Sequence, residues 1–296
     1  MPSTYAHFRF GNEVLRRLPA CLADEIENQK KLFLIGIHGP DLLFYYKPLS
    51  SNQINRIGYG SHKLTGAEFF GMRAEAFANS PNQEGFKSYL IGTVCHFALD
   101  SFCHPIILEK AGTSDMSHSE IELAFDRYLL ACDGFDPVHH HLVDHIVPDR
   151  VSSSVIAHFY SPASSEDIIL ALKSMHSCIE LLTSRIPFKR QIFDAVLFAT
   201  GNYEKMHGML LPKNTGNRFG EVNAELEREF NKALEVAPEM VCEVLDFMGK
   251  KTSLGGLFQK TFSGSSEQPD SRTASEKHIG KGQERHDTMG RAVKLS

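Results

Sequence analysis

Histidine and aspartate recur at a spacing of four residues in the segment HFALDSFCHP, which contains His96, Asp100 and His104. On a helix that turns 100° per residue, these three side chains fall within about 80° of arc and share one face. His96 and His104 would lie about 12 Å apart along the helix axis, whereas bonds from zinc to its protein ligands are about 2.0–2.2 Å long. One ion therefore cannot bind all three side chains. Asp100 lies between the two histidines, where its two oxygens can bridge ions.

A second unit of the same kind is His118-Ser-Glu-Ile-Glu122. His118 and Glu122 share a helical face, while Glu120 points elsewhere. Pro105 predicts that the first helix ends near His104, because the residue before a proline is disfavoured in the helical conformation. Five ligand-type side chains on two apolar helices favour a metal site over isolated core histidines, since burying so many titratable groups is costly without a compensating charge.

Further ligand-type residues lie upstream: His7 in TYAHFRFG, His38 and Asp41 in GIHGPDLLFYY, and His62 in GYGSHKL. The Gly-Pro-Asp turn can present Asp41 into a cleft. Residues 44–46, Phe-Tyr-Tyr, either line that cleft or belong to the core of the next helix. Downstream, His141 and His145 are also four residues apart and invite a metal interpretation, but we expect a helix at the surface or the cleft rim there.

The elements that must position these residues are predicted to be helices. Apolar residues recur about every four positions in residues 221–248, which predicts a long amphipathic helix with a kink at Pro238. Similar patterns predict helices over residues 82–103, 115–131, 166–183 and 190–211, mainly as scaffold. The period-two alternation typical of strands is missing. We therefore predict an all-α fold, a multi-helix bundle.

Composition sets the outer limits. The 296 residues are 42 % apolar and include 15 histidines and no tryptophan, with a formal net charge of −5. This is a globular chain, and its charge argues against a dedicated nucleic-acid binder. Residues 263–296 are polar and rich in Gly and Ser, which predicts a disordered tail. We expect one domain over residues 1–262, with the metal site mainly in residues 4–130 and helical scaffold in residues 131–262.

The features that report on compartment favour the cytoplasm. The N-terminal segment lacks the basic start and apolar run of a secretion signal, and no apolar run approaches the ~20 residues of a membrane-spanning helix. The six cysteines are scattered, without a C-x-x-C pair. We expect them to be reduced, mostly buried thiols.

Taken together, the motifs carry a family resemblance. Along residues 4–130 the chain has, in order, Y-x-H-F, G-x-H-G-P-D, G-S-H, H-F-x-L-D-S-x-C-H-P and H-x-x-I-E. This set resembles the bacterial zinc-dependent phospholipase C family, which is similar to the fungal zinc nucleases of single strands and to the N-terminal domain of glycosylphosphatidylinositol-specific phospholipase D. The resemblance implies an all-helical fold with three zinc ions at the bottom of a cleft. The ligands it implies are Asp41, His62, His96 and Asp100 for one zinc, His104, His118 and Glu122 for a second, and His7 with Asp100 for a third.

The third site departs from the family pattern. Secreted members expose an N-terminal tryptophan whose amine and carbonyl complete that site, and this chain has no tryptophan. Removal of Met1 before Pro2 would leave an amine five residues before His7, and our hypothesis is that this amine takes the place of the tryptophan. The sequence thus predicts two or three zinc ions.

The metals suggest a mechanism. A water that bridges two zinc ions loses a proton near neutral pH, because zinc lowers its pKa to about 7, and can then attack phosphorus in line. We expect Asp41 to orient or deprotonate this water besides being a ligand, and the third ion to stabilise the leaving oxygen. The positive charge of three zinc ions exceeds the negative charge of the carboxylates Asp41, Asp100 and Glu122, so the local electrostatic field would attract a phosphodiester.

The sequence therefore predicts a zinc-dependent phosphodiester hydrolase similar to phospholipase C, with a phospholipid as the favoured substrate and transient contact with a membrane surface. The absence of tryptophan counts against avid bilayer binding. One alternative is a zinc-dependent nuclease or other phosphoesterase, for which nucleic acid would be a partner. Another is a non-catalytic metal-binding protein. The oligomeric state is not predicted.

Overall fold

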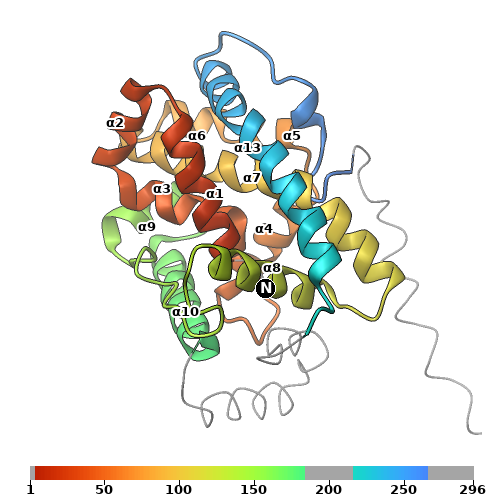
Figure 1. The fold of residues 1–296 in the computed structure, drawn as a ribbon. Helices are drawn as coiled ribbons and strands as arrows, with labels where there is room; N and C mark the ends of the chain where they lie inside the picture. Colours follow the sequence, from red (N-terminus) through yellow and green to blue (C-terminus); the bar gives the residue numbers. More distant parts are fainter. Residues whose placement is uncertain (1–3, 184–215, 266–296) are drawn as a thin grey trace, which may run out of the picture.

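Helices build almost all of the computed structural model, which describes residues 4–183 and 216–265 (Figure 1). Within these ranges there is no strand, and the single isolated β-bridge joins Thr65 to Thr261. The predicted all-α fold is confirmed. The helices are α1 (Thr4–Arg17), α2 (Ala20–Asn28), α3 (Lys30–Gly36), the 3-10 helix η1 (Gly39–Tyr45), α4 (Gln53–Ser61), α5 (Gly66–Gly71), α6 (Ala74–Ala78), α7 (Gln83–Thr113), α8 (His118–Cys132), α9 (Arg150–Phe159), α10 (Ser165–Thr183), α13 (Gly220–Met248) and the 3-10 helix η3 (Gly256–Gln259).

The central element is α7, which packs against α3, α13, α1 and α8 (Figure 1). It is long and apolar enough to cross a bilayer, but 78 % of its most apolar stretch is buried inside the protein, as expected of a core helix. Close packing against α3 depends on Gly36 and Gly92, because a Cβ atom at Gly92 would collide with backbone atoms of α3. This approach brings the end of α3, and the turn that follows it, next to the middle of α7.

The sequence placed the end of α7 too early. The helix continues through Pro105 to Thr113, so His104 lies inside it rather than at its end. Proline removes one backbone hydrogen bond, and this loss is tolerated because packing holds the helix on both sides of it. The C-terminal segment packs here: Phe262 accepts a hydrogen bond from His104, and Gly264 lies against Ser101 and Pro105.

The start of α8 also differs from the prediction. It begins at His118 rather than Asp115, because Ser117 forms a capping box with Glu120. The Ser117 hydroxyl accepts from the Glu120 N–H, and the Glu120 carboxylate accepts from the Ser117 N–H at 2.8 Å. The cap fixes the first turn of the helix, from which His118 projects.

Two other helices follow the sequence closely. The predicted helix over residues 221–248 is α13, which continues through Pro238, and the one over residues 166–183 is α10. The helix predicted over residues 190–211 lies outside the described residues. Residues 266–296 of the predicted tail also lie outside them. At the start of that tail, the backbone carbonyl of Ser265 accepts a hydrogen bond from the Thr261 N–H at 2.8 Å.

The expected helix around His141 and His145 is wrong. Residues 133–149, between α8 and α9, form turns and irregular backbone. Asp136 accepts hydrogen bonds from the backbone N–H groups of Val138 and His139, which is a turn that competes with helix formation. His141 and His145 therefore do not share a helical face.

Candidate metal centre

Five elements supply the eight predicted ligands. His7 lies in the first turns of α1, Asp41 in η1, and His62 directly after α4. The central helix α7 carries three ligands and α8 carries two. These elements surround the middle of α7, and the eight side chains form three groups whose ligand atoms lie within 4.8 Å of one another: His7, His96 and Asp100; Asp41, His62 and His96; and His104, His118 and Glu122.

The first cluster joins Asp41, His62 and His96. Nε2 of His62 lies 2.8 Å from Oδ1 of Asp41, and Nε2 of His96 lies 3.9 Å from Oδ2. Asp41 and His96 are buried, at 4 % and 0 % exposure. Gly39 lets the turn approach this closely, because it has φ +50° and a Cβ atom there would lie 2.5 Å from the His96 ring.

The second cluster joins His104, His118 and Glu122 across two helices. Oε1 of Glu122 lies 3.1 Å from Nε2 of His118, one turn earlier on α8, and 3.5 Å from Nε2 of His104 on α7. Glu122 is buried, whereas His118 is partly exposed. This cluster therefore borders the solvent through α8.

Asp100 forms the third cluster with His7 and His96 and connects it to the other two. Its Oδ2 lies 3.2 Å from Nε2 of His96 and 4.0 Å from Nε2 of His62, on the side of the first cluster. Its Oδ1 lies 3.3 Å from Nε2 of His7 and 3.8 Å from Nε2 of His104. The four histidines around one buried carboxylate agree with the helix geometry that placed Asp100 between ions.

Several buried polar atoms at this point lack a hydrogen-bond partner. Both ring nitrogens of His96 and Oδ2 of Asp100 are buried without one, since the 3.2 Å approach between them lacks hydrogen-bond geometry. Leaving such groups unsatisfied costs about 1–3 kcal/mol each. Imidazole nitrogen and carboxylate oxygen are the ligands that zinc prefers alongside thiolate. The residues present therefore fit a bound zinc ion.

Backbone carbonyls orient two of the ligand rings. Nδ1 of His62 donates to the carbonyl of Gly58 at 2.9 Å, and Nδ1 of His104 donates to that of Phe262 at 3.0 Å. Each bond makes Nδ1 the donor and turns Nε2 toward the cluster, where it can bind a metal once its own proton is displaced. Sequence reasoning missed both partners, because a backbone carbonyl has no residue-type signature.

The charges in the cluster shift one another's pKa values strongly. Burial opposes ionisation of Asp100, but His104 and His96 hold its pKa well below the usual range. Glu122 behaves in the same way beside His118 and His104. Burial also opposes protonation of His104, yet Asp100 and Glu122 raise its pKa to about 9. The protein thus keeps its carboxylates ionised and ready for a cation.

Of the aromatic residues after Asp41, one belongs to the core and another lies beside the site. Tyr45 is buried in the core. Phe44 lies beside the site, with its ring centroid 5.2 Å from that of His62, and stacks on Tyr59 at 4.4 Å. Tyr59 is 58 % exposed, so the stack leads from the surface to a ligand ring.

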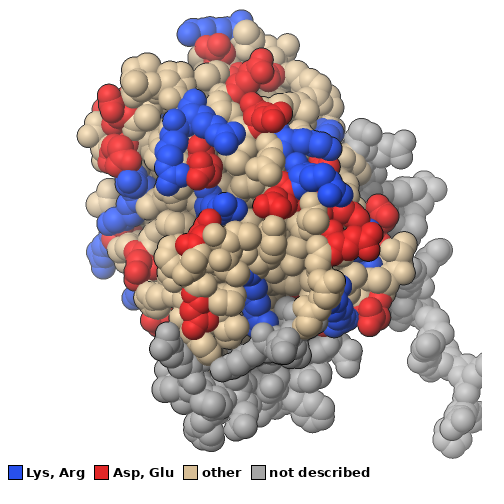
Figure 2. All heavy atoms as spheres, viewed as in Figure 1, with Lys and Arg blue, Asp and Glu red and all other residues tan. Residues whose placement is uncertain are grey.

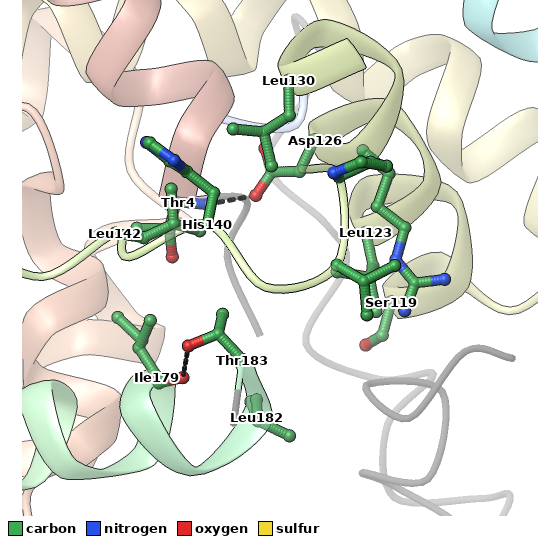
Figure 3. A pocket seen from close by; sticks show the side chains of 13 residues that line it. Thr4, Ser119, Leu123, Asp126, Leu130, His140, Leu142, Ile179, Leu182 and Thr183 are labelled. Atoms are coloured by element: carbon green, nitrogen blue, oxygen red, sulfur yellow. Dashed lines mark hydrogen bonds between the residues drawn. The ribbon is translucent and has the colours of Figure 1, made fainter. Parts of the chain in front are cut away.

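A carboxylate outside the predicted set anchors α1. Asp126, on α8, accepts hydrogen bonds from the backbone N–H groups of Thr4, Tyr5 and Ala6 at 2.8–3.0 Å. Figure 3 shows its bond to Thr4 at the edge of a pocket, and none of the eight predicted ligands is among the residues that line that pocket. Since His7 follows Ala6, Asp126 sets its position. The hypothesis that a terminal amine completes the third site concerns residues outside the described ranges.

The fold and the site define an all-helical protein with a buried centre of histidines and carboxylates. The profile of one family, described as zinc dependent phospholipase C, matches residues 6–179, which is more than half of the chain and includes all eight candidate ligands. The chain belongs to this family. No curated protein and no solved structure gave a significant match to it.

Proposed function

We propose that this chain is a zinc-dependent phosphodiester hydrolase of the phospholipase C type. The observation that carries the proposal is the convergence of three ligand clusters on the buried carboxylate of Asp100. The family match supports zinc and a phosphodiester substrate class.

The residues have distinct roles in this proposal. Asp41, His62, His96 and Asp100 would hold one zinc ion, His104, His118 and Glu122 a second, and His7 with Asp100 a third. Zinc bound there supplies a Lewis acid that lowers the pKa of water and polarises a phosphoryl oxygen. Asp41 would orient the attacking water or take its proton, besides holding zinc; its Oδ1 lies 2.8 Å from Nε2 of His62.

A phospholipid is the favoured substrate, met in transient contact with a membrane surface. Residues 1–262 contain 25 Lys and Arg against 31 Asp and Glu, which gives nucleic acid no general attraction. On the face in Figure 2 the two signs are interspersed rather than gathered into a basic stripe. All six cysteines are free thiols, in keeping with the cytoplasm as the proposed compartment, which cell fractionation would test. The expectation that most of them are buried is wrong, because only Cys95 and Cys103 are buried and three are exposed.

The direct test is an assay of the purified protein on three substrates: phosphatidylcholine, single-stranded DNA and a chromogenic phosphodiester. We expect hydrolysis of phosphatidylcholine and of the chromogenic ester, lost on chelation, restored by zinc, and lost in Asp100→Ala. Asp144→Ala is the matched control, because that carboxylate is 86 % exposed and far from the ligand set in the chain. Activity that survives chelation or Asp100→Ala would overturn the proposal, and cleavage of DNA alone would assign the site to a nuclease.

A further inference from the structure

Two histidines outside the three clusters form a close pair. His38 follows α3 and is 1 % exposed, and His145 lies in the irregular segment between α8 and α9. Their Nε2 atoms are 2.7 Å apart, with ring centroids 5.0 Å apart and ring planes at 23°. Neither residue belongs to a group of ligand atoms that could hold a metal among the described residues.

The distance defines the chemistry of the pair. Two imidazole nitrogens approach this closely only when one carries a proton and the other offers its lone pair. His38 is 1 % exposed and its Nδ1 is buried without a hydrogen-bond partner, so the contact with His145 is the polar contact of this side chain. The pair is therefore an N–H···N hydrogen bond between the two Nε2 atoms.

This bond ends on the turn that carries Asp41. The carbonyl of His38 accepts a hydrogen bond from the Asp41 N–H at 3.1 Å. Between them lies Gly39, which packs directly against the ring of His96. A shift of His38 would therefore move both Asp41 and its contact with His96.

The ring of His145 also contacts Phe8, which follows the ligand His7 in the chain. The ring centroid of Phe8, the residue after His7, lies 4.7 Å from that of His145. His145 thus lies between the Asp41 turn and the first turns of α1. It contacts the Asp41 turn through His38 and α1 through Phe8.

We propose that His145 is a positioning residue, which through its hydrogen bond to His38 holds the Asp41 turn where Asp41 meets His62 and His96. The role of Asp41 in hydrolysis rests on the proposed function. The position of Asp41 in the cluster does not rest on it, because metal binding alone reports on that position.

Three variants separate the hydrogen bond from simple packing. His145→Phe keeps a ring against Phe8 and removes the bond to His38. His145→Gln keeps an amide that can bond to His38. His141→Phe is the matched control, since His141 lies in the same segment, has a side chain 52 % exposed and pairs with Asp144 and Glu180 instead.

The measurements are titration of each metal-free variant with Co²⁺, followed by its absorption spectrum, and kcat and KM on a chromogenic phosphodiester with zinc. For His145→Phe we expect Co²⁺ affinity weakened about tenfold, an altered Co²⁺ spectrum, and kcat lowered about tenfold with KM within about twofold, which is the usual size of an effect behind a ligand. His145→Gln should recover most of both losses, and His141→Phe should match the wild type.

Three results would overturn the inference. The first is a His145→Phe protein whose Co²⁺ affinity and spectrum equal those of the wild type. The second is equal impairment of His145→Phe and His145→Gln. The third is the loss of one whole Co²⁺ ion with the others unchanged, which would make the pair metal ligands. A wild type that binds Co²⁺ but cleaves no phosphodiester would contradict the proposed function, and the Co²⁺ comparison would still decide the role of His145.

If His145→Phe does not fold, nitrogen NMR of the wild-type imidazoles decides the matter. The inference requires one proton between the two Nε2 atoms, carried by one of them and protected from exchange. Protons on Nδ1 of both rings, with neither Nε2 protonated, would contradict it.

Discussion

Oδ1 of Asp100 lies 3.3 Å from Nε2 of His7, and this contact ties the first helix of the chain to its central helix. The other oxygen of the same carboxylate faces His96 at 3.2 Å. Asp100 is 4 % exposed, so its charge is compensated by groups of the protein and by whatever cation they hold, rather than by water.

Asp126→Asn should destabilise the protein by about 1–3 kcal/mol, because hydrogen bonds to a charged group are worth more than neutral ones and three backbone N–H groups depend on this carboxylate. Urea unfolding measures the loss. Asp144→Asn, at an exposed carboxylate, is the control and should leave stability unchanged. Equal stability of the two variants would show that Asp126 does not anchor α1.

Gly39→Ala should lower both stability and metal affinity. The residue has φ +50°, and its new Cβ atom would lie 2.5 Å from the His96 ring. We expect a loss of more than about 1 kcal/mol in unfolding experiments, the scale of strain in such a backbone conformation. Gly60→Ala in α4 is the matched control, because a Cβ atom there meets nothing within 4 Å. It should be neutral or stabilising, and a similar loss in both variants would contradict the close packing of the Asp41 turn.

The stability of the metal-free protein should fall on acidification partly through His145. Burial lowers the pKa of this histidine from 6.5 to about 4, so between these pH values the unfolded chain binds the proton more readily than the folded one. The stabilising contribution is therefore present above pH 6.5 and is lost as the pH falls toward 4. We expect His145→Phe to lose less stability over this range than the wild type, by about 2–3 kcal/mol. Parallel pH profiles from urea unfolding would contradict this.

Chelation should lower the midpoint of thermal unfolding, because a ligand that binds only the folded state stabilises it, by about 2.7 kcal/mol at 100 times its Kd. Scanning calorimetry of the protein with zinc and with a chelator measures the difference. It should shrink in Asp100→Asn and remain in Asp144→Asn. A midpoint independent of zinc would mean that the clusters do not bind metal in the folded state.

Much of the site could be predicted from sequence because its ligands recur at helical spacing. His96, Asp100 and His104 share a face of α7, and His118 and Glu122 share a face of α8, as the period of the helix requires. Which upstream residues join them is a matter of tertiary structure. His7, Asp41 and His62 were placed by resemblance to the family, and the structure brings them to the same point.

The sequence was less reliable where tertiary packing outweighs local preference. Pro105 does not end α7, because the helix packs on both sides of the lost hydrogen bond. The histidines near residue 140 lie on an irregular segment, and His145 finds its partner in His38, far away in the chain. Asp126 gave no signal either, since a buried carboxylate that caps another helix looks like any helical aspartate.

The most direct measurement is the zinc content of the purified wild-type protein and of Asp100→Asn, by elemental analysis against protein concentration. The three clusters predict two or three zinc ions per wild-type chain, and at least one fewer in the variant, with Asp144→Asn equal to the wild type. A folded wild-type protein that binds less than one zinc ion per chain in zinc-containing buffer would contradict the assignment of these residues to a metal centre.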